Sequence, residues 1–230
     1  MSAVLEARGV GRTLPGPPPV TIVTDASLAV GKGEFVAVTG PSGSGKSSLL
    51  YLLGLLDRPS AGTVLVDGRD TGALEAPALD RLRLERLGFV FQFHFLLPEF
   101  TALENVHIPI RRLGRLGGKA GEERALALLA DLGLADAAGK YPDQLSGGMR
   151  QRAAIARALA NDPAILLADE PTGNLDTANA RTVFDIFARL TAEQGRTVIV
   201  VTHDPDLAAR AGRRIHLVDG RIVSDRAGAS

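Results

Sequence analysis

A glycine-rich segment near the start of the chain contains the residue types needed to bind a polyphosphate. Gly40, Gly45, Lys46 and Ser47 satisfy the spacing G-x-x-x-x-G-K-S. Glycines let the backbone curl so that successive N–H groups face one anion, and the dipole of a following helix adds to the attraction. We therefore predict a nucleotide site formed by Gly40, Pro41, Ser42, Gly43, Ser44, Gly45, Lys46, Ser47 and Ser48.

The segments on either side fit this interpretation. The apolar run 35–39 predicts a strand that leads into the loop, and 48–53 reads as the start of a helix. In such a loop Lys46 would reach the β- and γ-phosphates of ATP, and the hydroxyl of Ser47 would ligate Mg²⁺.

Two adjacent acids, Asp169 and Glu170, follow the apolar run 164–168. A strand that ends in this way puts its carboxylates at the carboxyl edge of the sheet, beside the phosphate loop. Asp169 suits Mg²⁺, which prefers oxygen ligands, and Glu170 suits a base that polarises water for attack on the γ-phosphate. We therefore expect ATP hydrolysis, with Lys46 and Glu170 as catalytic residues.

Strand and helix patterns alternate, which predicts an α/β fold with a mainly parallel sheet. The expected strands are 35–39, 63–66, 164–168, 198–202 and 215–218, and 177–193 is an expected helix. Asp67-Gly68 and Asp219-Gly220 predict tight turns, the second leading into a hairpin strand at 221–223. The proline-rich segment 15–19 predicts a loop between two N-terminal edge strands.

Helical patterns dominate from about 101 to 161, where strand signals are scarce. This change predicts a helical subdomain inserted into the α/β core. We expect one domain over 1–230, with a core at about 1–92 and 162–230 and a helical subdomain at about 93–161.

Composition narrows the function classes. Lys plus Arg and Asp plus Glu both total 26, so the basic excess typical of nucleic-acid binders is missing and we expect no direct nucleic-acid contact. The absence of cysteine excludes disulfides and cysteine metal sites. With no visible signal peptide or membrane span, we expect a cytoplasmic protein that reaches the inner membrane only through a partner.

The segment Leu145-Ser146-Gly147-Gly148-Met149 and the helix pattern 150–159 after it resemble the signature of ABC ATPases, and the resemblance covers nearly the whole chain. It implies a P-loop NTPase core with an N-terminal antiparallel β part and an inserted α-helical subdomain. It also implies a head-to-tail homodimer in which Ser146, Gly147 and Gly148 contact the γ-phosphate bound by the opposing subunit.

The same resemblance assigns three further residues. Gln92 is similar to the glutamine that contacts Mg²⁺ and water and senses the membrane partner. Asp176 ends the segment 173–176, which resembles the D-loop of the family. His203, after the apolar run 198–202, resembles the histidine that holds the γ-phosphate. His94, His107 and His216 have no comparable context, and we interpret them as structural or exposed.

Two positions depart from the family pattern. Met149 replaces the usual Gln or Glu of the signature, which removes a polar group near the nucleotide. The family usually stacks adenine on an aromatic residue, but the corresponding position falls near Thr13, and residues 1–34 contain no Phe, Tyr or Trp. We therefore expect weaker and less base-selective nucleotide binding.

The segments 89–106 and 167–176 are similar to the branch of lipoprotein-releasing ATPases and their MacB and FtsE relatives. That branch implies a permease partner. The apolar cluster in the first segment suits either core packing or a groove for a permease helix; its members are Phe91, Phe93, Phe95, Leu96 and Leu97.

Three functional alternatives remain open at this stage. A soluble ABC ATPase acting on nucleic acid or the ribosome would usually carry long coiled coils or two ATPase units, and the sequence contains neither. A module that binds ATP without hydrolysing it is disfavoured by Glu170 and His203. Within the transporters, lipoprotein release and MacB-like export both fit.

Overall fold

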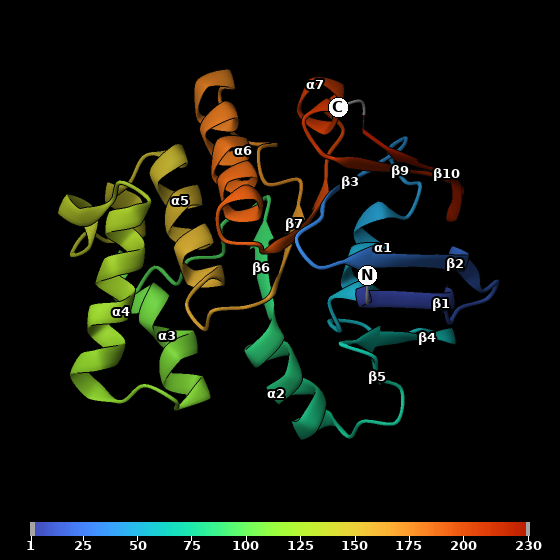
Figure 1. Cartoon of the computed structure of the whole chain (residues 1–230), viewed down its shortest axis with the longest axis horizontal. Coiled ribbons are helices and arrows are strands. Elements are labelled where there is room, and N and C mark those ends of the chain that lie inside the picture. Colours follow the sequence, from blue (N-terminus) through green and yellow to red (C-terminus); the bar gives the residue numbers. More distant parts are fainter. Residues whose placement is uncertain (1–2, 229–230) are drawn as a thin grey trace.

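The chain forms two β-sheets flanked by helices, in a computed structural model that describes residues 3–228 (Figure 1). The first sheet is antiparallel with strand order β2-β1-β4-β5. Its strands are β1 (Ala3–Leu14), β2 (Val20–Gly31), β4 (Ala61–Val66) and β5 (Arg69–Asp70). This sheet confirms the expected N-terminal antiparallel part.

The second sheet has the order β10-β9-β3-β8-β7-β6, and β10 alone runs antiparallel to its neighbour. Its strands are β3 (Phe35–Thr39), β6 (Leu87–Phe91), β7 (Ile165–Asp169), β8 (Thr197–Val201), β9 (Arg213–Val218) and β10 (Arg221–Ala227). The expected mainly parallel sheet and the hairpin at Asp219-Gly220 are therefore confirmed.

Seven α-helices occur within the described residues 3–228. They are α1 (Lys46–Leu53), α2 (Ala76–Arg86), α3 (Ala102–Leu113), α4 (Gly118–Asp131), α5 (Gly147–Ala158), α6 (Thr177–Ala192) and α7 (Pro205–Ala209). Two short 3₁₀ turns cover Ala135–Ala137 and Pro142–Gln144. Between 93 and 161, all of which the structure describes, every regular element is helical.

The parallel strands divide the interior into two cores. Alternate residues of a strand point to opposite faces, so Phe35 and Ala37 of β3 join one buried cluster while Val36 and Val38 join the other. All five residues of both β7 and β8 are buried, because helices or the first sheet cover both faces. The ends of the strands that carry the site residues are therefore held in place by close packing on both faces of the sheet.

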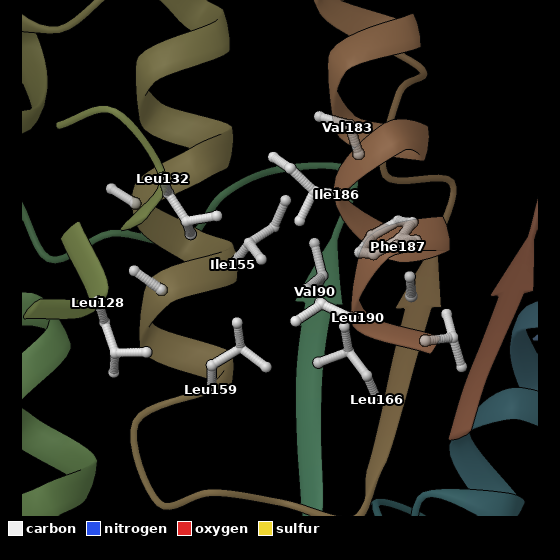
Figure 2. Packing of buried hydrophobic residues seen from close by; sticks show 14 of the residues in the cluster. Val90, Leu128, Leu132, Ile155, Leu159, Leu166, Val183, Ile186, Phe187 and Leu190 are labelled. Carbon is white, nitrogen blue, oxygen red and sulfur yellow. The ribbon is translucent and has the colours of Figure 1, made fainter. Parts of the chain in front are cut away.

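The helical part shares its core with the parallel sheet. Figure 2 shows Ile155 of α5, and Leu159 directly after that helix, in one cluster with Ile186 and Leu190 of α6, next to the strands β6 and β7. All four side chains are at most 7% exposed. Packing between α5 and α6 therefore fixes the position of the signature segment 145–149 relative to the strand ends of the parallel sheet.

The strand β6 has no counterpart among the sequence predictions. No turn residue separates it from α2, whose last residue is Arg86, and Gly88, the second residue of the strand, weakens the strand pattern. The glycine is required by packing, since a Cβ there would lie 2.4 Å from the carbonyl oxygen of Ala158. Close approach of α5 to β6 thus explains why the local pattern is weak.

We expect Leu190→Ala to lower the free energy of unfolding by about 2–5 kcal/mol, because Leu190 is fully buried where α6 meets the sheet. Denaturant unfolding followed by circular dichroism measures this. The matched control is Leu126→Ala on α4, where the leucine is 39% exposed. This substitution should lower the free energy of unfolding by about 0.5 kcal/mol or less. Equal costs at the two positions would contradict the core assignment.

Candidate functional site

The phosphate loop connects the end of β3 to the start of α1. Gly45 precedes the helix with a φ of 92°, and no side chain caps the first turn of α1. Its backbone N–H groups are therefore left for another acceptor, and an anion fits this position. Gly40 has a φ of 145°, and a Cβ there would lie 2.0 Å from the carbonyl oxygen of Leu217. The tight path of the loop thus depends on glycine.

Two polar groups of the loop have incomplete partners. The Lys46 ammonium donates to the carbonyl oxygens of Gly40 at 3.0 Å and Pro41 at 2.8 Å, both of them neutral. Lys46 is 8% exposed, and the buried hydroxyl oxygen of Ser44 has no hydrogen-bond partner among residues 3–228. Buried polar groups of this kind normally find partners, so the loop fits a polyphosphate that would supply them.

Asp169, the last residue of β7, receives a hydrogen bond on each carboxylate oxygen. The Ser47 hydroxyl donates to Oδ1 at 2.7 Å and the Tyr51 hydroxyl donates to Oδ2 at 2.7 Å. Burial first, and then the bond to Asp169, raise the pKa of Tyr51 to about 12, so this hydroxyl stays protonated at neutral pH. A serine hydroxyl beside a carboxylate is a hard oxygen-donor set, which fits Mg²⁺.

Glu170 turns away from Asp169 and contacts His203. Its carboxylate Oε2 lies 2.8 Å from His203 Nδ1 and accepts the backbone N–H of His203 at 3.3 Å. Glu170 has a φ of 45°, an uncommon left-handed conformation for a residue with a side chain. The side chain of Glu170 is 17% exposed and that of His203 is 70% exposed, so the pair lies at the surface opening of the site.

Gln92 lies against the segment that follows Glu170. A Cβ on Gly173 would come within 2.8 Å of the Gln92 amide nitrogen, and the Asn174 side chain donates to the Gln92 carbonyl oxygen at 3.3 Å. Gln92 also follows β6 directly, next to the strand that ends in Asp169. The structure thus brings Gln92 to the edge of the sheet where the acids lie.

The signature segment forms the start of α5 and contacts α6. The Ser146 hydroxyl caps α5 by accepting the Met149 N–H at 3.3 Å. A Cβ on Gly148 would lie 2.0 Å from the Asn179 amide oxygen, and Gly147 faces Leu175. Asp176 caps α6 through Asn179, whose backbone and side-chain hydrogen bonds hold the pKa of Asp176 below its usual range. These residues thus form a second cluster, centred on the starts of two helices.

Sequence reasoning missed two contacts at the site. Tyr51 stands four residues after Ser47, so both share one face of α1, and that spacing was the available signal. His216, which we expected to be structural or exposed, is partly buried, and its Nδ1 lies 3.0 Å from the Thr39 hydroxyl directly before the phosphate loop. No local pattern indicates that pair, because it depends on the register of β3 with β9.

The family profile described as ABC transporter matches residues 23–173. The chain belongs to the ABC transporter family. It is 54% identical over 206 residues to the lipoprotein-releasing system ATP-binding protein LolD 1 of Chlorobium chlorochromatii, covering 90% of this chain and 84% of that protein. It is 47% identical over 225 residues to LolD of Aquifex aeolicus, with 98% of each chain covered.

Other matches agree with this family. The chain is 53% identical over 224 residues to the macrolide export ATP-binding/permease protein MacB 1/2 of Paracoccus denitrificans, covering 97% of this chain and 33% of that one. A dimeric ATP-binding cassette solved in a post-hydrolysis state with ADP and Pi superposes with a TM-score of 0.92 at 40% identity, covering 98% of this chain and 99% of that one. This chain is accordingly an ABC-type ATPase.

The hairpin of β1 and β2, where we expect the base of ATP to lie, contains no aromatic residue. Thr13 and Thr21 pair across β1 and β2, with their hydroxyl oxygens 3.1 Å apart and exposed. The next residue, Ile22, places its carbonyl oxygen where a Cβ on Gly45 would come within 2.5 Å. This end of the hairpin therefore adjoins the phosphate loop, and Thr13, Thr21 and Ile22 present hydroxyl and aliphatic groups there.

We expect Thr13→Tyr to tighten ATP binding by about fivefold or more, since stacking of a base on an aromatic ring contributes about 1–3 kcal/mol. Titration with ATP and with inosine triphosphate, which lacks the adenine amino group, measures affinity and base selectivity together. Thr21→Val serves as the control for loss of the threonine pair. The explanation is wrong if Thr13→Tyr leaves both affinities unchanged.

Proposed function

We propose that this chain hydrolyses ATP as one of two identical subunits that drive a membrane permease in lipoprotein release. The observation that carries hydrolysis is the meeting of the phosphate loop with two adjacent acids at the carboxyl edge of one parallel sheet. Ser47 contacts the first acid and His203 contacts the second. Each acid thus has a different partner and can take a different role in the reaction.

In this proposal the phosphate loop binds ATP, with Lys46 at the β- and γ-phosphates and the N–H groups of 43–48 around them. Ser47, Asp169 and Gln92 would hold Mg²⁺, which neutralises charge on the phosphate oxygens when bound. No group of three or more His, Cys, Asp or Glu side chains among the described residues is arranged to hold a metal ion by itself. That agrees with Mg²⁺, which takes few protein carboxylates and shares its coordination with phosphates and water.

Glu170 would accept the proton of the attacking water, and His203 would hold both Glu170 and the γ-phosphate. The 2.8 Å contact between the two side chains supports this pairing, as does the constrained backbone of Glu170. Strained conformations cost about 1–3 kcal/mol and persist where the surrounding structure holds them, often at functional sites.

A second copy of the chain would complete each site. Gly148 contacts Asn179 of α6 and Gly147 faces Leu175, while the Ser146 hydroxyl caps the first turn of α5, which is a suitable anion site. A head-to-tail partner would present these residues to the bound γ-phosphate, with Asp176 at the boundary. The 40%-identical cassette that was solved as a dimer supports this arrangement.

The permease would dock at a groove of about 330 Å³ between β6, α3 and α5. Its lining is largely apolar, and exposed rings stand beside it on Phe93, 62% exposed, and Phe95, 63% exposed. Aromatic side chains with arginine nearby are typical of protein interfaces. No helix among the described residues is long and apolar enough to cross a bilayer. We propose that the chain lies at the cytoplasmic face of the inner membrane and contacts it through the permease alone. We also propose 93–161 as the helical subdomain.

Lipoprotein release is favoured over export because the relatives matched over most of both lengths carry the LolD name. MacB is nearly as similar in sequence, but this chain spans about a third of its length. The two functions differ in the membrane partner, which makes that partner the deciding observation.

We expect Glu170→Gln to lower steady phosphate release by at least about 100-fold, because general base catalysis contributes 10²–10⁴-fold. ATP binding should persist, since the phosphate loop is unchanged. A coupled phosphate assay and an ATP titration measure the two effects. Unchanged phosphate release would remove Glu170 from the proposed mechanism, and absent release from the wild type would favour a module that only binds ATP.

The same variant identifies the partner. Tagged Glu170→Gln, purified from detergent-solubilised membranes with ATP and Mg²⁺, should retain a permease with few membrane helices and a large extracytoplasmic domain. A permease with many helices would indicate ordinary solute transport. Recovery of no membrane protein, with wild-type hydrolysis intact, would contradict the transporter assignment.

A further inference from the structure

Asp169 is held by two side chains from one face of α1. Ser47 donates to Oδ1 and Tyr51 donates to Oδ2, each at 2.7 Å. Residues four apart lie one turn apart on a helix, so the two hydroxyls approach the carboxylate side by side. Rotation of the carboxylate about its Cβ–Cγ bond would break both hydrogen bonds.

The ring of Tyr51 is itself fixed by packing. It meets the ring of Phe91 edge-on, with centroids 6.4 Å apart, and Phe91 stacks on Phe89 at 5.9 Å. Phe91 is also the residue that pairs with Asp169 across β6 and β7. The hydroxyl therefore reaches Asp169 from a ring that packs against the neighbouring strand, which reduces the entropy lost in forming the bond.

We propose that Tyr51 is a positioning residue, whose hydroxyl holds Asp169 in the orientation that lets Ser47 and Asp169 take up Mg²⁺ together with ATP. The inference rests on the Mg²⁺–ATP site proposed above. Groups that orient a metal-binding carboxylate typically change metal affinity by 10–100-fold when they are removed. Asp169 is 8% exposed, so little water is available to replace the lost donor.

The role predicts an effect confined to the metal-bound state. Lys46 and the loop N–H groups, which hold the phosphates, have no contact with the Tyr51 hydroxyl among the hydrogen bonds of the described residues. Loss of the hydroxyl should therefore weaken binding of Mg²⁺–ATP while binding of metal-free ATP stays the same. A role in packing alone would change both equally, because the ring contacts do not depend on the metal.

The test compares Glu170→Gln with the double variant Tyr51→Phe, Glu170→Gln, so that no turnover occurs. Binding of a fluorescent ATP analogue is titrated with Mg²⁺ and again with EDTA. We expect the Mg²⁺-dependent gain in affinity to fall by about tenfold in the double variant, with the EDTA affinity within about twofold of the parent. The control is Tyr141→Phe in the same background, because Tyr141 is the chain's other tyrosine and is 45% exposed.

Three results would overturn the inference. They are an unchanged Mg²⁺ gain in Tyr51→Phe, an equal loss of affinity with Mg²⁺ and with EDTA, and a failure of the variant to fold in thermal unfolding without ligand. A parent protein with no Mg²⁺ gain at all would instead contradict the proposed function, so the two failures can be told apart.

Discussion

The site depends on one short hydrogen bond between segments that are 122 residues apart, from the Ser47 hydroxyl to Asp169. It forms only if the first turn of α1 lies against the end of β7, although β8 separates β7 from β3 in the sheet. The buried faces of β7 and β8 hold that spacing, because neither strand can shift without exposing apolar side chains on two sides. Packing of the sheet therefore sets the distance between the phosphate loop and the acids.

Two adjacent carboxylates beside a polyphosphate would repel each other and the ligand if they pointed the same way. The left-handed backbone of Glu170 prevents this: Asp169 faces the hydroxyls of α1, whereas Glu170 faces His203. The first carboxylate is almost fully buried and doubly hydrogen-bonded, and the second lies beside a largely exposed imidazole. These different surroundings suit the two roles that we propose for the pair, cation binding by Asp169 and proton transfer by Glu170.

Much of this arrangement could be predicted from the sequence, because the phosphate loop, the acid pair and the buried strands are local patterns with fixed spacing. The strand β6 could not, since Gly88 is dictated by the approach of α5, which a local pattern does not reveal. Tyr51 was missed for a related reason: a tyrosine on an apolar helix also fits core packing, and only the position of Asp169 gives its hydroxyl a partner. The signature residues needed the family resemblance, because their own contacts lead away from the phosphate loop.

We propose that each ATP site is shared between two copies of the chain, and a mixture of two inactive variants can reveal this sharing. Lys46→Ala disables the phosphate loop, and Ser146→Arg disables the signature. In a head-to-tail dimer of one of each, one of the two sites keeps both intact halves. With shared sites, an equimolar mixture should regain roughly a quarter of wild-type phosphate release, since half of the dimers are mixed and each of these has one intact site out of two. A mixture as inactive as its components would contradict the shared site.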